Sequence, residues 1–118
     1  ETLRVDADRD QLFRILSNLC RNALQAIEQL EPPAGQILIG ASRNGRSVTI
    51  EVRDDGPGVP AKARAHLFQA FQGSARAGGT GLGLAVAHEL VAAHGGNITL
   101  LDTDRGTAFR IEIPDRDN

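Results

Sequence analysis

The sequence predicts an α+β fold of two layers, in which helices pack on one face of a mixed, mostly antiparallel sheet. Two observations lead to this prediction. Strand-like segments occur in pairs joined by short turns, as in hairpins, and only two segments show the apolar spacing of a long helix. The elements also do not alternate as in a βαβ wind. A chain of 118 residues is long enough for one domain of common size.

The first helix is predicted near the N-terminus. Apolar residues recur at helical spacing between Leu12 and Leu30, and Asp8 before them is a residue type that caps helix starts. We therefore expect a helix over residues 8–30. Before it, the alternating residues 2–5 suggest a short edge strand.

Four strand-like segments are predicted in two hairpins. Apolar and polar residues alternate on both sides of a first turn around Gly45 and of a second turn around Gly106. Glycine is favoured in such turns because it adopts positive φ at no steric cost. The predicted strands cover residues 36–42, 47–54, 97–102 and 107–113.

An irregular stretch and a second helix lie between the two hairpins. Residues 55–80 are rich in Gly, Ala, Pro and Ser, with only a helical turn or two near 60–71. Such a stretch inside a compact domain is typical of a functional lid or a disordered loop. Residues 81–94 then predict an apolar helix, which Gly95 and the glycine after it end.

Composition places the chain among ordinary globular domains. Apolar residues make up 41% and charged residues 24%, so a core is possible and disorder is not expected. A net charge of −2 without a basic run argues against a nucleic-acid partner. No apolar run reaches the roughly 18 residues of a membrane span, so we expect no direct membrane contact. Cys20 is the only cysteine, and its place in an apolar helix pattern predicts a buried thiol.

A glycine-rich turn runs straight into the second helix. Its glycines let the backbone approach a bound group, and the helix start offers unpaired N–H donors and the positive end of the dipole. This arrangement predicts a phosphate site. No Lys follows any glycine cluster, which excludes a Walker loop. The spacing of Gly79, Gly81 and Gly83 after an irregular stretch does not fit a dinucleotide fingerprint.

The alternation of the strand at 47–54 turns one carboxylate inward. Asp54 continues the apolar face of this strand, whereas Asp55 falls on the other face. Gly56 and Gly58 then let the chain turn close to whatever Asp54 holds. A semi-buried carboxylate beside glycines suits the exocyclic amine of adenine, and the alternative is a plain Asp-Gly-Pro-Gly turn.

The first helix adds two amide side chains. Asn18 and Asn22 are four residues apart and therefore lie on the same side of the helix, beside its apolar stripe. An amide oxygen is a hard ligand that suits Mg²⁺, which takes few protein ligands and completes its shell with phosphate and water. The alternative is a pair of buried hydrogen-bonding amides.

Together and in this order, these features resemble the ATP-binding catalytic domain of sensor histidine kinases. That domain has the Bergerat fold and belongs to the superfamily shared with gyrase-type topoisomerases, Hsp90 chaperones and MutL proteins. The stretch 22–27 is most similar to kinases of the nitrogen-regulation type. The resemblance covers almost the whole chain. Its motifs are the N box at 18–23, the G1 box at 54–58, the F box at 67–71, the G2 box at 79–84 and a terminal G-T-x-F at 106–109.

The resemblance implies a role in binding Mg-ATP for each matched residue. Asn22 would ligate Mg²⁺, and Asp54 would accept a hydrogen bond from the adenine amine, with Thr107 nearby and acting through water. Gly56 and Gly58 would shape the adenine pocket. The backbone that would cradle the phosphates comprises Gly79, Thr80, Gly81, Leu82 and Gly83.

The resemblance also implies one ATP-binding domain over residues 1–118, with a lid at about 59–80 that Phe68 and Phe71 anchor. Related kinases often carry Lys or Arg three residues after the magnesium ligand, where this chain has Gln25. Arg76 in the lid is the first candidate to supply that positive charge to the phosphates, and Arg21 is the second.

Asn18 separates the reaction classes of the superfamily. In its ATP hydrolases this position holds a Glu that activates water, and Asn cannot take up a proton at neutral pH. The resemblance therefore implies transfer of the γ-phosphate of ATP to a histidine on a separate dimerisation domain. None of the three histidines of the chain lies in a matching acceptor motif, so the dimerisation domain is expected to be absent from this sequence.

The expected partners are that dimerisation domain and a downstream response regulator. The expected location is the cytoplasm, whether or not the parent protein is anchored in a membrane. Two alternatives stay open: an ATPase of the same superfamily, and a degenerate kinase that serves as a nucleotide-binding regulatory module.

Overall fold

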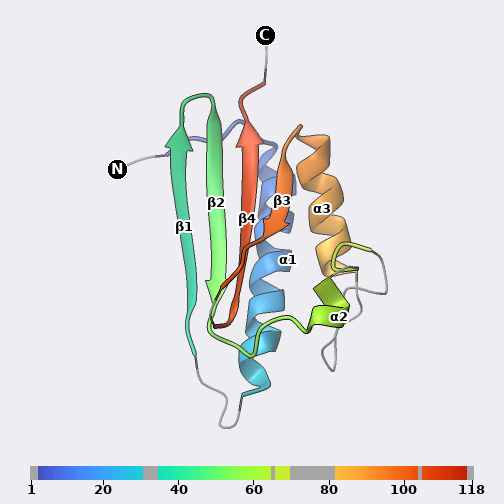
Figure 1. Cartoon of the computed structure of the whole chain (residues 1–118). Coiled ribbons are helices and arrows are strands. Elements are labelled where there is room, and N and C mark those ends of the chain that lie inside the picture. Colours follow the sequence, from blue (N-terminus) through green and yellow to red (C-terminus); the bar gives the residue numbers. More distant parts are fainter. Residues whose placement is uncertain (1–2, 31–34, 65, 70–81, 104, 117–118) are drawn as a thin grey trace.

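Two layers make up the structure, a computed structural model that describes residues 3–30, 35–64, 66–69, 82–103 and 105–116. One layer is a four-stranded sheet, and α1 and α3 lie together on one of its faces (Figure 1). This arrangement confirms the α+β prediction. The elements in chain order are α1 (Arg9–Glu28), β1 (Ile37–Asn44), β2 (Ser47–Asp54), α2 (Ala61–Arg64), α3 (Gly83–Ala93), β3 (Asn97–Leu100) and β4 (Thr107–Pro114).

The sheet has the strand order β1-β2-β4-β3, and each of its three pairings is antiparallel. We expected a mixed sheet with a short strand at residues 2–5, but residues 3–5 are not in a strand. The Arg4 carbonyl accepts a hydrogen bond from Arg43 Nη2 at 2.6 Å, and the Ala7 N–H donates to the Val5 carbonyl. The segment therefore bends towards the start of α1.

The helix α1 begins where the sequence predicts. Asp8 is its N-cap, and Asp8 Oδ2 accepts a hydrogen bond from the Gln11 N–H at 2.9 Å. Cys20 is half-buried rather than buried, because it lies about 100° round the helix from Leu19. The buried stripe of the helix is Ile15, Leu19, Ala23, Ala26 and Ile27.

The two hairpins have the predicted turns. Gly45 and Gly106 both adopt positive φ, 66° and 73° respectively, which a residue with a side chain rarely does. The strand β2 has the predicted bounds, whereas β1 extends to Asn44 because Asn44 still pairs with Ser47. The strand β3 is shorter than predicted and ends at Leu100.

Two glycines end the helix α3. The Gly95 N–H donates to the Ala92 carbonyl at 2.9 Å and the Gly96 N–H to the Val91 carbonyl at 3.0 Å. Gly95 has a φ of 76°. These two bonds and the positive φ define a Schellman motif. The stop predicted from the two glycines is therefore confirmed.

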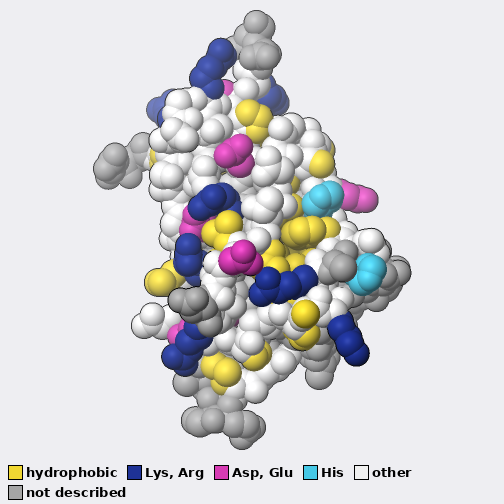
Figure 2. Space-filling model, in the orientation of Figure 1, with side chains coloured by type: hydrophobic (Ala, Val, Ile, Leu, Met, Phe, Trp, Pro, Cys, Tyr) yellow, Lys and Arg dark blue, Asp and Glu magenta, His cyan; other side chains and the backbone are white. Residues whose placement is uncertain are grey.

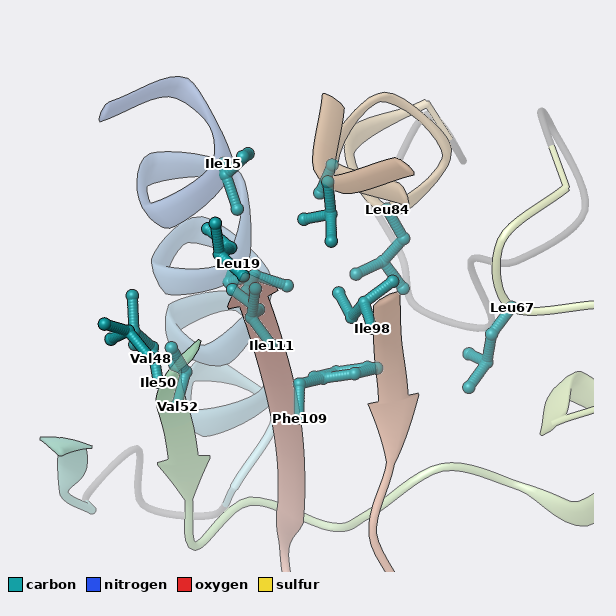
Figure 3. Packing of buried hydrophobic residues seen from close by; sticks show 13 residues of the cluster. Ile15, Leu19, Val48, Ile50, Val52, Leu67, Leu84, Ile98, Phe109 and Ile111 are labelled. Atoms are coloured by element: carbon teal, nitrogen blue, oxygen red, sulfur yellow. The ribbon is translucent and has the colours of Figure 1, made fainter. Parts of the chain in front are cut away.

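The core fills the space between the helices and the central strands β2 and β4 (Figure 3). Every second residue of β2 is buried, and so are the helix-facing residues of β4. Burying each large apolar side chain is worth about 1.5–3 kcal/mol, so the two central strands form a firm support. The largest fully buried side chains are Ile15, Leu19, Val48, Val91, Ile111 and Ile113.

The outer face of the sheet carries charged side chains of both signs (Figure 2). Glu51 is at its centre and forms ion pairs with Arg53 at 3.0 Å and Arg110 at 2.9 Å. These hydrogen bonds, from Arg110 first and Arg53 second, lower the pKa of Glu51 below its usual 4.5. The charges on this face therefore compensate one another and give it no strong net sign.

Candidate functional site

The candidate site lies where β2 ends and β4 begins. Asp54 is the last residue of β2, Thr107 is the first residue of β4, and the two are direct partners across the antiparallel pair. Both are buried, with 8% and 2% of their surface exposed. Directly opposite residues on neighbouring strands point to the same side of a sheet, so the carboxylate and the hydroxyl lie next to each other on the helix side.

The inward position predicted for Asp54 is confirmed. Asp54 follows Val48, Ile50 and Val52 on the buried face of β2. Its Oδ1 accepts a hydrogen bond from the Gly56 N–H at 2.9 Å. Because a buried carboxylate needs hydrogen-bond donors, the loop backbone and the side chain hold each other in place.

The hydroxyl of Thr107 is the one buried side-chain polar atom that lacks a hydrogen-bond partner among the described residues. Leaving a buried hydroxyl unsatisfied costs about 1–3 kcal/mol. A hydroxyl both donates and accepts, and this one lies beside a carboxylate that only accepts when ionised. Together they match a ligand edge that carries an amine donor next to a ring acceptor, as the edge of adenine does.

Glycines let three chain segments meet at this place. A Cβ added to Gly56 would lie 2.8 Å from the Cβ of Ala26 in α1, and one added to Gly58 would lie 3.2 Å from the carbonyl oxygen of Gly106. Gly58 also has a φ of 85°. Side chains at these positions would push the loop away from α1 and β4. Gly56 and Gly58 therefore let the loop lie close to α1 and to the turn before β4.

Three residues of this junction make contacts that the sequence did not predict. A Cβ on Gly106 would overlap the carbonyl oxygen of Asp54, so only glycine lets the turn before β4 reach the end of β2. Asp55 is half-buried, and its Oδ1 accepts a hydrogen bond from the Gln36 N–H at 2.8 Å. Gly35 packs directly against that carboxylate. Strand alternation reveals no such contact, because Asp55 and Gln36 lie just outside the strands.

The two asparagines of α1 are half-buried and one helical turn apart, as their spacing predicts. No group of three or more His, Cys, Asp or Glu side chains suited to a metal occurs in the described part of the chain. A magnesium ion held by Asn22 would thus depend on phosphate and water for the rest of its shell. Gln25 is half-buried on the same helix, and Arg21 is exposed.

The start of α3 has no capping side chain. Leu82 is the N-cap residue and makes no side-chain capping bond, so the first N–H groups of the helix receive no partner from a cap side chain. A Cβ at Gly83 would meet nothing within 4 Å. Four other predicted phosphate-binding residues, Arg76, Gly79, Thr80 and Gly81, lie outside the described residues.

Phe68 joins the described part of the predicted lid to the core. Leu67 is buried, with 4% of its surface exposed. The Phe68 ring stacks on His88 of α3, with centroids 5.1 Å apart, and meets Phe109 of β4 edge-on at 6.1 Å. The anchoring predicted for Phe68 is confirmed. Phe71 lies outside the described residues.

Two of the three histidines contact other parts of the fold through their rings. His88 stacks on Phe68, and His66 is exposed in the turn after α2. His94 Nε2 accepts a hydrogen bond from the Asp8 N–H at 3.1 Å, and its Nδ1 lies 2.7 Å from the Leu90 carbonyl oxygen. Because Nε2 accepts, the Nδ1 carries the proton and donates to Leu90.

Comparison with known protein families gives one match that spans nearly the whole chain. Residues 7–117 match the family described as "Histidine kinase-, DNA gyrase B-, and HSP90-like ATPase". The sensor histidine kinase ZraS of Escherichia coli K12 is 40% identical over 111 residues, which cover 93% of this chain and 23% of ZraS. The sensory histidine kinase/phosphatase NtrB of Escherichia coli O157:H7 is 36% identical over 119 residues, which cover 92% of this chain and 33% of NtrB. The chain thus spans a third or less of these relatives.

Solved structures of histidine kinases have the same fold. The nucleotide-free catalytic domain of the histidine kinase ThkA superposes with a TM-score of 0.82 at 32% identity, over 96% of this chain and 72% of that one. Full-length ShkA in complex with AMPPNP gives a TM-score of 0.76 at 38% identity, over 92% of this chain and 22% of that one. Within the described residues, no helix has both the length and the apolar character needed to cross a membrane.

Proposed function

Because this chain belongs to the histidine kinase-, DNA gyrase B- and HSP90-like ATPase family, we propose that it is the ATP-binding domain of a two-component sensor histidine kinase. In this role it binds Mg-ATP and donates the γ-phosphate to a histidine on a separate dimerisation domain. The observation that supports this function most is the buried pair of Asp54 and Thr107, whose hydroxyl has no partner among the described residues. ZraS and NtrB, both sensory kinases, provide the second support.

Adenine is the base that suits the buried pair. The Asp54 carboxylate accepts from the exocyclic amine, and the Thr107 hydroxyl reaches the base through a water molecule. Guanine presents a carbonyl where adenine presents the amine, and a carboxylate repels that carbonyl. Gly56 and Gly58 keep side chains out of the space beside the base. ShkA was solved with AMPPNP, an ATP analogue, which supports this choice.

The phosphates extend from the base towards α1 and α3. Asn22 ligates the magnesium ion through its amide oxygen, and the phosphates complete the shell. The start of α3 has no side-chain cap, so the Gly83 N–H faces the phosphates, and the helix dipole favours their negative charge. We assign the remaining phosphate contacts to Gly79, Thr80 and Gly81 and the compensating charge to Arg76.

Transfer rather than hydrolysis follows from the chemistry of Asn18. An amide does not accept a proton at neutral pH, so no general base activates a water molecule at this position. In the transfer, the imidazole nitrogen of the acceptor bonds to the γ-phosphorus while the bond to the bridging oxygen breaks. The electron pair of the broken P–O bond stays on the bridging oxygen, which leaves as part of ADP.

Residues 1–118 act as one domain, with a lid at about 59–80 that closes over the nucleotide. The domain works with the kinase's own dimerisation domain and with a response regulator. ThkA has been solved in complex with the response regulator TrrA, which supports the second partner. The cytoplasm supplies ATP and is the compartment that we assign to the domain.

Calorimetry on the full 118-residue chain tests this function. We expect Mg-ATP to bind with a dissociation constant between about 1 μM and 1 mM, and hydrolysis to be much slower than about 1 s⁻¹. Asp54→Asn and Gly81→Ala should each weaken binding at least about tenfold. Asp10→Asn, which removes an exposed carboxylate from the first turn of α1, is the matched control and should bind as the wild type does.

Three results would contradict the proposal in different ways. Binding that neither Asp54→Asn nor Gly81→Ala weakens would remove the assigned site. Steady hydrolysis near 1 s⁻¹ would indicate an ATPase of the same superfamily. A complete lack of nucleotide binding in the presence of Mg²⁺ would indicate a regulatory module that has lost kinase function.

A further inference from the structure

Asp55 joins two segments that are far apart in the sequence. Its Oδ1 accepts a hydrogen bond from the Gln36 N–H at 2.8 Å. Gln36 lies one residue before β1, and Asp55 lies one residue after β2. The pairing of these strands ends with Ile37 opposite Asp54, so the bond continues the hairpin by one step beyond the sheet. It fastens the chain that leads into β1 to the loop that carries Asp54.

The carboxylate of Asp55 sits in a close-packed position. A Cβ added to Gly35 would overlap Asp55 Oδ1 and would lie 3.1 Å from Ile27 Cγ1 at the end of α1. A side chain at position 35 would therefore displace the carboxylate. The contact therefore needs a glycine at position 35 and a hydrogen-bond acceptor at position 55.

The other side of the same loop is held through the backbone. The Gly106 turn touches the backbone of Asp54, and the Gly106 carbonyl accepts a hydrogen bond from Thr103 Oγ1 at 3.1 Å. Gly56 packs against Ala26 of α1. These contacts come from β4 and α1. On the β1 side, the bond from Asp55 to Gln36 is the side-chain link that the described residues provide.

The hydrogen bond between Gln36 and Asp55 is important because β1 is an exposed edge strand. Almost all of its residues are exposed, including Leu38 at 59% and Ile39 at 54%. An exposed edge strand has few buried contacts to fix its ends. Without the bond to Gln36, the part of the loop beyond Asp54 would be held from the α1 and β4 sides only.

We propose that Asp55 is a positioning residue for nucleotide binding. By holding Gln36, it fixes the loop so that the Asp54 carboxylate and the Thr107 hydroxyl face the base together. Asp55 itself does not touch the nucleotide. The inference rests on the proposed function, and it assigns selectivity for adenine to a residue outside the base contacts.

The test compares both ends of the hydrogen bond in the full chain. Asp55→Ala removes the acceptor, Asp55→Asn keeps an acceptor without the charge, and Gln36→Pro removes the N–H donor while leaving Asp55 in place. Proline is tolerated just before an edge strand. Calorimetry with Mg-ATP and competition with Mg-GTP give the affinities, and thermal unfolding reports folding. Asp10→Ala is the control for loss of an exposed carboxylate.

Loss of either partner should weaken Mg-ATP binding by about tenfold and leave the weak Mg-GTP affinity within about twofold, because GTP does not use the amine contact. Asp55→Asn should bind ATP as the wild type does. The double variant Asp55→Ala with Gln36→Pro should be no worse than either single variant, since both remove one bond. If Asp55→Ala does not fold, Gln36→Pro and Asp55→Asn still give the answer.

Several results would overturn the inference. These are wild-type ATP affinity in Gln36→Pro, equal loss of ATP and GTP affinity, or additive losses in the double variant. Any of them, with normal ATP binding by the wild type, would remove the role of Asp55 and leave the proposed function intact. Failure of the wild type to bind ATP would instead reject the proposed function, and the role of Asp55 with it.

Discussion

The two ends of the sheet are held together in different ways. At the end where β2 stops and β4 starts, which we call the loop end, the connecting segments touch through backbone atoms at Gly56, Gly58 and Gly106. At the opposite end, which we call the hairpin end, charged side chains link the β1–β2 hairpin, the N-terminal segment and the exit of β4. The ion pairs of the hairpin end are Arg43–Asp115 at 2.9 Å and Arg116–Asp6 at 2.7 Å.

The two ends of the sheet are thus held by different kinds of contact. Glycine contacts and the hydrogen bond from Gln36 to Asp55 hold the loop end, where the Thr107 hydroxyl has no partner among the described residues. At the hairpin end, the charged side chains of these two ion pairs bind one another. A ligand therefore finds hydrogen-bonding capacity at the loop end, and substitutions at the two ends should differ in kind as well as in size.

The largest expected effect is the loss of a glycine at the loop end. Gly106→Ala places a Cβ on the Asp54 carbonyl and keeps a φ of 73°, so it should lower the free energy of unfolding by about 3 kcal/mol or more. Gly45→Ala at the hairpin end has a similar φ of 66° but open space around its Cβ. It should cost only about 1 kcal/mol.

Urea unfolding of both glycine variants measures this difference. The comparison isolates crowding, because both residues bear the same backbone strain. Equal destabilisation of Gly106→Ala and Gly45→Ala would mean that the close contact at the loop end contributes nothing.

The second effect separates binding from folding at Thr107. Thr107→Val replaces the buried hydroxyl by a methyl group of similar volume, so the unsatisfied polar group disappears. We expect the free energy of unfolding to rise by about 1 kcal/mol, and the affinity for Mg-ATP to fall about fivefold. Urea unfolding and calorimetry on the same samples measure the two quantities. A variant that loses stability and keeps its affinity would show that the hydroxyl serves the fold.

The third effect concerns the start of α3. A Cβ at Gly83 meets nothing within 4 Å, so Gly83→Ala should leave the fold intact and stabilise the helix by about 0.5–1 kcal/mol. The methyl group would narrow the approach of a phosphate to the helix N-terminus, and we expect about threefold weaker Mg-ATP binding. Stronger nucleotide binding by this variant would exclude the start of α3 as a phosphate contact.

The smallest effect is electrostatic and belongs to the hairpin end. Hydrogen bonds from Arg116 lower the pKa of Asp6 below its usual 3.8. A lowered pKa means that the pair stabilises the fold above pH 3.8 and that this contribution is lost as the pH falls through the lowered value. Asp6→Asn should therefore make the urea midpoint fall less steeply as the pH is lowered. At neutral pH, high salt should lower the urea midpoint of the wild type towards that of Asp6→Asn, because salt screens the ion pair. Asp10→Asn is the control, and an equal response of both variants would contradict the prediction.

Periodicity predicted the parts of the fold that repeat. The period of two in β2 placed Asp54 inward, and helical spacing placed the buried stripe of α1 and the half-buried Asn18 and Asn22 beside it. These predictions succeed because each depends on neighbours in the same element. The order of the motifs predicted the kinase family, which the family match over residues 7–117 confirms.

The sequence did not predict the contacts made by residues outside the strands and helices. Asp55 and Gln36 lie outside the strands that they connect, so alternation says nothing about the bond between them. The strand expected at residues 2–5 was wrong because Arg43 and the turn at Ala7 draw this segment towards α1. Similarly, the need for glycine at position 106 depends on how closely the end of β2 approaches, which only the three-dimensional structure reveals.

The most direct test of the site is to map nucleotide binding on the backbone by amide chemical shifts during titration with Mg-AMPPNP. We predict the largest changes at the loop end, at Gly56 and Thr107, with further changes at Gly83 and none at Gly45 or Asp115. Changes centred on the hairpin end, or on Glu51 and Arg110 of the outer sheet face, would contradict the assignment of the nucleotide site to Asp54 and Thr107.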